Sequence, residues 1–324
     1  MSSKPQVSIL INNYNYARFL PEAIESALNQ TYRNCEVIVV DDGSTDNSRD
    51  VLAGFDTRIV AILKANGGQA SAFNAGFAAS RGDWVFFLDA DDYFLPEKIG
   101  TLMKFAGTVT DVGFVVHNMT CCDIEGRPIS FERPSQSRLL NFDYRRKARE
   151  GKLGIMMPTT SGLGLRRDVL EKILPMPEDI AITADNYMKV AGLALTPLLW
   201  VPSFLGVQRI HPWNLYTRVK ETELDRLNQA IVGAKISYRL KEKFPFLSKI
   251  AWKSYGQALF RLASSRHSNK RNTFSKIHAE YNLFEFSLPA AFYIGAGFIS
   301  ACGRQLRQFA VQTLAGLSIR RDVS

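Results

Sequence analysis

The stretch DWVFFLDADDYFLP, residues 83–96, joins a continuous apolar run to three carboxylates. The run 84–88 has the length and composition of a buried strand, and it stops at Asp89, Asp91 and Asp92. Side chains two apart on an extended segment point the same way, so Asp89 and Asp91 face one site at the strand's carboxyl end. Carboxylates this close repel one another unless a cation lies between them. An acidic turn before a helix explains the same residues, so the motif alone leaves both interpretations open.

The N-terminal third alternates apolar, strand-length runs with helical patterns. The runs are 7–11, 36–40, 59–63 and 84–88, and the helical patterns are 20–30, 48–53 and 70–80. This alternation predicts an α/β fold with a mainly parallel central sheet and helices on both faces.

Polar loops follow the first, second and fourth of these runs, beginning at Asn12, Asp41 and Asp89. In a parallel sheet these loops gather along one edge, where they offer the ring of Tyr14 for stacking, amides and carboxylates. That combination suits a nucleoside diphosphate with a metal ion. Each loop can also be an ordinary turn or helix cap, but three in order, each after a strand, favour a site.

Beyond residue 110 the pattern is less regular, and it changes again after Thr217. Strand-like runs occur at 112–116 and 202–211, a hairpin and loop are expected at 121–145, and the polar segment 158–162 precedes a helix near Asp168. Long helical patterns with few breakers then follow at 222–244, 247–264 and 272–285. We therefore expect a domain of residues 1–217 followed by a basic α-helical region, 218–324.

The charge of the chain is unevenly distributed. The net charge is +9, yet residues 235–324 carry 15 Lys and Arg against 4 Asp and Glu. A basic segment suggests an anionic partner, and no recognised nucleic-acid-binding module is visible in it. The 4 cysteines have no metal-like spacing, so reduced thiols in a cytoplasmic protein are the simplest interpretation. No run reaches the roughly 20 apolar residues that span a bilayer.

Ordered motifs between residues 7 and 92 make the chain resemble the family 2 glycosyltransferases of bacterial cell-surface polysaccharide synthesis. The motifs are VSILI (7–11), YN (14–15), ALNQTY (27–32), EVIVVDDGSTD (36–46), NGG (66–68), NAG (74–76) and FLDADD (87–92). The resemblance is looser from 111 to 211. It implies a GT-A fold, in which residues 1–110 form a nucleotide-binding half and 111–217 an acceptor half, and inversion at the anomeric carbon.

The resemblance also implies which residues bind the donor. The loop of Asn12 and Tyr14 is expected to pack on the base and ribose, and Asp42 to bind the base, commonly uracil. Gly68 lies in the glycine pair expected beside the nucleotide, and Asp89 is expected to contact the ribose.

A divalent cation, manganese or magnesium, is expected at Asp91 and His211, although a lone histidine is also commonly structural. Arg209 could neutralise phosphate. The chain departs from the family at Phe73, where many relatives have Arg or Lys, so that positive charge would have to come from elsewhere.

The general base of such enzymes is usually a carboxylate in an acidic pair on the acceptor side. Asp185 matches it best, but Ala184 occupies the first place of the pair, and Asp179 is the reserve candidate. A helix cap is the structural alternative for Asp185. Thr160 and Ser161 are expected to line the acceptor side.

These features together predict a metal-dependent inverting glycosyltransferase. It would move a hexosyl or N-acetylhexosaminyl group from a UDP-sugar to a glycan or lipid-linked saccharide. The C-terminal helices would attach it to the inner face of the cell membrane, or pack on the catalytic domain or a second copy. The other function kept open is a catalytically impaired, nucleotide-sugar-binding scaffold. A nucleotidyltransferase would need a Gly- and Lys-rich first loop, and a nicotinamide-binding protein a Gly-x-Gly-x-x-Gly motif; neither is present.

Overall fold

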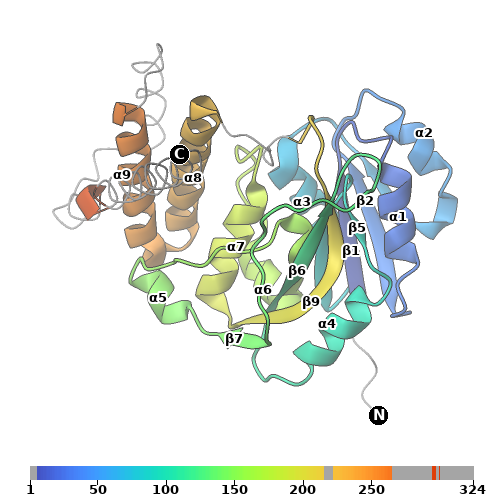
Figure 1. The fold of residues 1–324 in the computed structure, drawn as a ribbon, viewed down its shortest axis with the longest axis horizontal. Coiled ribbons are helices and arrows are strands. Elements are labelled where there is room, and N and C mark those ends of the chain that lie inside the picture. Colours follow the sequence, from blue (N-terminus) through green and yellow to red (C-terminus); the bar gives the residue numbers. More distant parts are fainter. Residues whose placement is uncertain (1–5, 215–221, 265–293, 297–298, 300–324) are drawn as a thin grey trace, which may run out of the picture. The chain divides into compact units, whose positions relative to one another are not determined.

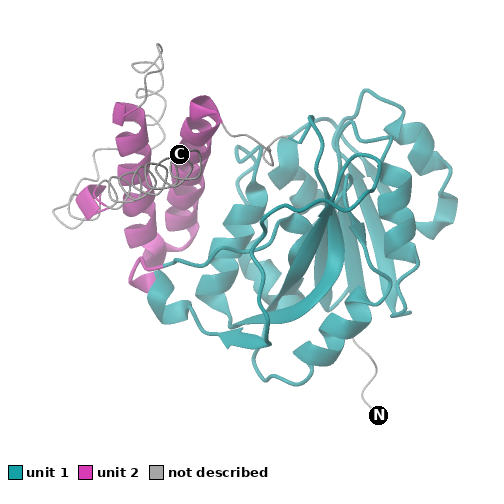
Figure 2. Ribbon diagram, viewed as in Figure 1, with its two compact units in different colours: residues 1–148, 153–219 teal, residues 149–152, 220–324 magenta. Residues whose placement is uncertain are grey.

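The computed structural model describes residues 6–214, 222–264, 294–296 and 299 (Figure 1). The chain divides into two compact units, residues 1–148 with 153–219 and residues 149–152 with 220–324 (Figure 2). The expected helix 272–285 lies outside the described residues.

The described part of the first unit is built on a nine-stranded sheet with the order β3-β2-β1-β4-β8-β6-β9-β5, and β7 pairs with β9. The strands are β1 (Val7–Asn13), β2 (Cys35–Asp41), β3 (Val60–Leu63), β4 (Trp84–Asp89), β5 (Tyr93–Phe94), β6 (Phe114–Cys122), β7 (Leu140–Phe142), β8 (Leu163–Arg166) and β9 (Leu198–Arg209). Strands β3, β2, β1 and β4 are parallel neighbours, as are β6 and β9. The predicted α/β fold with a mainly parallel sheet is confirmed.

Helices cover both faces of this sheet (Figure 1). They are α1 (Leu20–Leu28), α2 (Ser48–Ala53), α3 (Gly68–Ala79), α4 (Lys98–Ala106), α5 (Arg145–Arg149), α6 (Arg167–Ile173) and α7 (Ala184–Leu195), with short 3-10 turns at Asp56–Arg58 and Thr160–Gly162. One face packs on α1 and α4 in a continuous apolar core that includes Phe86 and Leu88. The alternate strand residue, Phe87, packs edge-on against Phe73 of α3. Successive side chains of β4 therefore pack on opposite faces of the sheet, and both faces are buried, as is usual for a parallel strand.

The second half of the sheet departs from the sequence expectation in several ways, and β9, for example, begins at Leu198, before the expected start at 202. Strand β6 begins at Phe114 and runs to Cys122, past the expected end at 116, and the polar side chain of Asn118 in its second half has hydrogen-bond partners. Asn118 accepts a hydrogen bond from the Trp200 indole at 2.9 Å. Strand β8 inserts between β4 and β6 and is antiparallel to both. No periodic pattern in its four residues signals this pairing.

The described part of the second unit holds α8 (Glu223–Lys243), a 3-10 turn (Pro245–Leu247) and α9 (Ser248–Ser264). Thr222 and Asp225 form a reciprocal capping box at the start of α8. The two helices share an apolar core that includes Tyr238, Trp252 and Tyr255. Within the residues that the structure describes, no helix is long and apolar enough to cross a membrane.

Candidate active site

The polar loops after β1, β2 and β4 meet at one edge of the sheet, as predicted. The parallel register sets Asn13 opposite Asp41 and Asn12 opposite Asp89. The two polar atoms of the Asn12 amide are buried and have no hydrogen-bond partner within the described chain. Tyr14 is 44% exposed, which excludes the core position that was its structural alternative.

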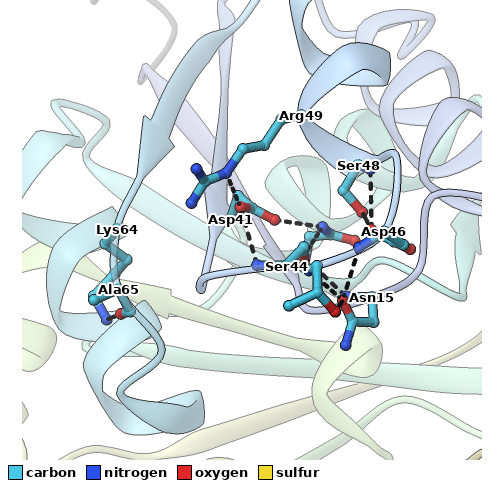
Figure 3. Close-up of polar contacts among 10 residues, drawn as sticks. Asn15, Asp41, Ser44, Asp46, Ser48, Arg49, Lys64 and Ala65 are labelled. Carbon is cyan, nitrogen blue, oxygen red and sulfur yellow. Dashed lines mark hydrogen bonds and ion pairs between the residues drawn. The ribbon is translucent and has the colours of Figure 1, made fainter.

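A hydrogen-bond network fixes the loops after β1 and β2 to each other (Figure 3). The Asn13 amide donates to Asp41 at 2.9 Å and to the Ser44 hydroxyl at 3.1 Å, and Arg49 pairs with Asp41. Asn15 adopts a left-handed conformation, and its side-chain oxygen accepts from the backbone N–H of Thr45 at 2.7 Å. Asn and Gly tolerate this conformation best, which explains why an asparagine is suitable at position 15.

Asp42 binds the glycine loop that precedes α3. One carboxylate oxygen accepts from the Gly67 N–H at 3.0 Å and from the Lys64 ammonium at 2.7 Å, and the other accepts from the Gly68 N–H at 2.7 Å. Gly68 has a positive φ of 83°, which a residue with a side chain adopts only at a cost. Asp42 therefore organises the loop at which a nucleotide is expected.

The turn after β4 is held from behind by the Thr160–Gly162 segment. The Ser161 hydroxyl donates to Asp92 at 2.6 Å and accepts from the Asp89 N–H at 3.1 Å, while Thr160 hydrogen-bonds the Asp89 carboxyl. Thr160 and Ser161 are 3% and 0% exposed, so their hydroxyls face the turn. We expected both residues to line the acceptor side, and an acceptor contact for either residue stays a prediction.

Asp91 and His211, expected to share a cation, are brought together. The His211 Nε2 lies 3.1 Å from Asp91 Oδ2, and the Asn214 amide donates to the same oxygen at 2.9 Å. His211 stacks on the Phe19 ring, and its Nδ1 is buried without a partner in the described chain. Asn214 was not identified from the sequence, although its place three residues after His211 is a pattern that could have indicated it.

Arg209 does not face an open phosphate site. Its guanidinium pairs with Glu22 at 2.6 Å, its Nε donates to the Asp91 carbonyl, and its backbone N–H donates to Asp92 at 3.0 Å. The residue is 4% exposed. Arg209 therefore supports the acidic turn from β9, and a phosphate contact for it stays a prediction.

The acidic turn is electrostatically strained. Burial, with the charges of Asp91 and Asp185 close by, raises the pKa of Asp89 to about 8. Burial and the same neighbouring Asp91 raise the pKa of Asp92 well above its usual value. Burial, followed by the charge of Asp91, also raises the pKa of the Tyr16 hydroxyl. A cation at this turn would relieve the repulsion.

The residues fit a divalent cation of the kind that shares its ligands with a substrate. Within the described part of the chain, no group of three or more His, Cys, Asp or Glu side chains is placed to hold a metal ion. Magnesium, however, is usually held by one or two carboxylates while substrate phosphates complete its coordination. The crowded carboxylates of Asp89 and Asp91, and the His211 Nε2 that faces Asp91, match that requirement.

Asp185 is the second residue of α7, and the helix cap is Thr183, so the capping alternative for Asp185 was wrong. Asp185 is 8% exposed and its carboxylate pairs with Lys189. The charge of Asp185 contributes to the raised pKa of Asp89, so the two carboxylates lie close enough to interact. The reserve candidate, Asp179, is exposed.

Lys189 is a basic residue that the sequence interpretation missed. Its charge lowers the pKa of Asp89, and its side chain is 13% exposed. The sequence interpretation asked for a positive charge to replace the one absent at Phe73, which is fully buried against Phe87. Lys189 places a positive charge on α7 that acts on Asp89, and its spacing of four residues from Asp185 was the available signal.

Comparison with known proteins agrees with the fold. An uncharacterized glycosyltransferase of Nostoc sp. is 39% identical over 214 residues, which cover 64% of this chain and 66% of that protein. The alignment thus spans just under two thirds of the relative's length. Among solved structures, S. aureus TarS 1–349 has a TM-score of 0.60 at 14% identity over 91% of this chain and 88% of that one. The mannosyltransferase PcManGT from Pyrobaculum calidifontis has a TM-score of 0.50 at 17% identity, over 94% and 88%.

At these identities the two solved structures establish a common fold, that of the GT-A glycosyltransferases. The family model described as glycosyl transferase family 2 matches residues 8–174, more than half of the chain. These residues include the polar loops after β1, β2 and β4. The chain therefore belongs to glycosyltransferase family 2.

Proposed function

We propose that this glycosyltransferase is a metal-dependent inverting enzyme that transfers a hexosyl or N-acetylhexosaminyl group from a UDP-sugar to a hydroxyl acceptor. The acceptor class that we propose is a glycan or lipid-linked saccharide of the bacterial cell surface. The observation that carries the proposal is a pair of hydrogen bonds that join the start of α7, where Asp185 lies, to the loop that Asp42 binds. The Ala184 N–H donates to the Gln69 side chain, and the N–H of the preceding residue, Gly68, donates to Asp42. A candidate base and a candidate donor site thus share one edge of the sheet.

The donor proposal rests on unfilled hydrogen-bonding capacity at the edge of β1. A buried amide without partners costs about 1–3 kcal/mol, so the Asn12 side chain calls for a polar ligand. Tyr14 exposes a ring beside it on which a base could stack. TarS has been solved with UDP-GlcNAc and PcManGT with GDP-Man and Mn²⁺, which supports a nucleotide-sugar donor here without deciding the base.

The reaction proposed is a single in-line displacement. Asp185 accepts the proton of the acceptor hydroxyl while that oxygen attacks the anomeric carbon from the face opposite the diphosphate. Lys189 holds the Asp185 carboxylate through its ion pair. Asp91, assisted by His211, would bind a manganese or magnesium ion, whose positive charge stabilises the departing diphosphate. One displacement inverts the configuration of the sugar.

Calorimetric binding of UDP, GDP and TDP, with and without Mn²⁺, tests the donor class and the metal role. We expect UDP to bind with a strong dependence on Mn²⁺, and Asp91→Ala to remove that dependence while the fold survives. Asp123→Ala, which removes a partly exposed carboxylate paired with Arg127, serves as the control and should bind like the unaltered protein. Unchanged Mn²⁺-dependent binding by Asp91→Ala would refute the metal role.

The scaffold alternative rests on Ala184, which takes the first place of the usual acidic pair. It predicts UDP binding without turnover. Release of UDP from UDP-sugars over a panel of saccharide and lipid-linked acceptors distinguishes the two functions. Turnover that Asp185→Asn abolishes, with a product of inverted anomeric configuration by NMR, supports the enzyme.

We further propose that residues 1–217 form the catalytic domain and that the basic region 218–324 binds an anionic membrane surface at the inner face of the cell membrane. Its described helices, α8 and α9, carry Lys241, Lys243 and Lys249 at the ends that face their connecting turn. Flotation with vesicles that contain anionic lipid, compared between the full chain and a truncation at Lys220, tests this. Equal flotation of both proteins would instead favour helices that pack on the catalytic domain or a second copy.

A further inference from the structure

The N-terminus of α7, which carries Asp185, lacks a cap of its own. The cap residue Thr183 has a positive φ of 51°, and its hydroxyl donates to the Ile182 carbonyl instead of accepting from the helix. The first N–H groups of a helix have no partner within the helix. The N–H of Ala184 is one of these donors, and it points to a residue far away in the sequence.

That residue is Gln69, the second residue of α3. The Gln69 side-chain oxygen accepts from the Ala184 N–H at 2.8 Å, across 115 positions of sequence. The Gln69 backbone N–H donates to the Ala181 carbonyl, also at 2.8 Å. One residue therefore holds both ends of the segment 181–184, and the next residue along the chain is Asp185.

The same loop reaches the expected nucleotide-binding carboxylate. Asp42 accepts the N–H groups of Gly67 and Gly68, directly before Gln69. Gly68 also lies against Ala181, since a Cβ atom at Gly68 would come within 2.6 Å of the Ala181 Cα. The consecutive residues 67–69 thus link Asp42, at the expected nucleotide site, to the segment 181–184 that leads into α7.

We infer that Gln69 is a positioning residue that fixes Asp185 beside Asp89 by capping α7 from α3. This inference rests on the proposed role of Asp185 as the base. Asp185 is at the second position of the helix, so any shift of the helix start moves its carboxylate directly. The ion pair with Lys189 cannot supply this restraint, because both residues are on the same helix and move together.

The first test is the steady-state kinetics of Gln69→Leu with the full-length protein. Leucine keeps the backbone bond to Ala181 but removes the acceptor for the Ala184 N–H. A misplacement of about 1 Å can cost about 100-fold in rate, so we expect kcat to fall between 10- and 100-fold. The UDP affinity and the donor KM should stay within about twofold, because the Asp42 and Gly68 contacts remain. The rate is expressed per UDP-binding site, which removes any contribution from unfolded protein.

Gln69→Glu provides the rescue and Asn74→Leu the control. A glutamate oxygen still accepts from the Ala184 N–H, so kcat should return to within about threefold of the unaltered enzyme. Asn74 is also on α3, and its amide makes two hydrogen bonds of 2.9 Å to the backbone of Met176 in the segment before α7. We expect both Asn74→Leu and Gln69→Leu to lower the melting temperature, because each removes a hydrogen bond between α3 and the region of α7. Only Gln69→Leu should lower kcat per UDP-binding site.

Three results would overturn the inference: a kcat for Gln69→Leu within twofold of the unaltered enzyme, no rescue by Gln69→Glu, or an equal loss of kcat in Asn74→Leu. Asp185→Asn, measured in parallel, separates this failure from that of the proposed function. If Asp185→Asn is inactive while Gln69→Leu is fully active, only the positioning role of Gln69 is wrong. If Asp185→Asn is fully active, the proposed base is wrong as well.

Discussion

The ammonium of Lys189 pairs with the carboxylate of Asp185 one helical turn earlier on α7, and both side chains are nearly buried, at 13% and 11% exposed. In a surface pair such a contact contributes little, because water screens both charges. A pair withdrawn from water behaves differently, since the loss of one partner leaves the other charge without compensation. Lys189 therefore stabilises the fold mainly because it neutralises the charge of the Asp185 carboxylate.

We expect Lys189→Met to lower the free energy of unfolding by about 3 kcal/mol, the typical cost of breaking a buried pair. The double variant Lys189→Met/Asp185→Asn should recover much of that loss, because a neutral amide needs no neighbouring cation. Urea unfolding of both variants and of Asp185→Asn completes the cycle. Equal instability of Lys189→Met and the double variant would mean that Lys189 contributes packing and not charge compensation.

Ser161→Ala tests the support of the acidic turn. The change removes one of the two hydrogen bonds of the buried Asp92 carboxylate, which keeps its bond from the Arg209 N–H, and it removes the Ser161 acceptor of the Asp89 N–H. An unsatisfied buried group costs about 1–3 kcal/mol. We expect lower stability and, because Asp89 and Asp91 are on the released turn, about tenfold weaker UDP binding in Mn²⁺ by calorimetry. Ser237→Ala, which removes a 2.9 Å bond to Ser254 between α8 and α9, is the control. Its UDP affinity should not change.

The fold of the N-terminal half could be predicted because its signals are local. Each strand from β1 to β4 is an apolar run followed by polar residues, and the helices between them show their own periodicity. Strand β8 could not be predicted in this way. Its position depends on a close approach, since a Cβ atom at Gly164 would come within 2.2 Å of the Phe86 ring. A contact between residues so far apart leaves no local pattern.

The residues of the candidate site also fall into two groups, those that a local pattern indicates and those that depend on distant contacts. Asp42, Asp89 and Asp91 were identifiable because strand ends in a parallel sheet share an edge, a rule that needs only the strand order. Ser161 was expected on the acceptor side, and no local pattern indicates its hydrogen-bond partners, which are 69 and 72 positions away in the sequence. Gln69, the second residue of α3, gains a proposed role only from its hydrogen bond to Ala184 on α7, 115 positions away in the sequence.

Lys98 gives a prediction about pH. Its side chain is fully buried, and its ammonium donates to the Ser161 carbonyl at 2.7 Å and lies 3.2 Å from the centre of the Phe94 ring. Burial holds the pKa of Lys98 well below its usual value, against the opposing charge of Asp92. The unfolded chain therefore binds this proton more readily than the folded one, so the stability contribution of Lys98 rises with pH.

Lys98→Met removes this titration and leaves the others in place. Urea unfolding at about pH 7, 8.5 and 10 should show the unaltered protein gaining stability relative to Lys98→Met as the pH approaches 10.5, the ordinary value for lysine. The gain should be lost as the pH falls through the lowered pKa of the folded protein. A difference between the two proteins that is constant over this range would show that Lys98 binds its proton equally well in both states.

Gly68→Ala and Gly126→Ala separate backbone strain from steric contact. Both glycines have a left-handed φ, +83° and +81°, so alanine at either costs about 1–2 kcal/mol. Nothing lies within 4 Å of a Cβ atom at Gly126, whereas one at Gly68 would strike Ala181. We expect Gly68→Ala to lose clearly more stability in urea and most of its turnover, because displacement of Ala181 carries Asp185 with it. Gly126→Ala should lose only the stability that the backbone strain costs, and its turnover rate should not change. If both variants lose equal stability and Gly68→Ala remains active, the contact between Gly68 and Ala181 does not govern the position of Asp185.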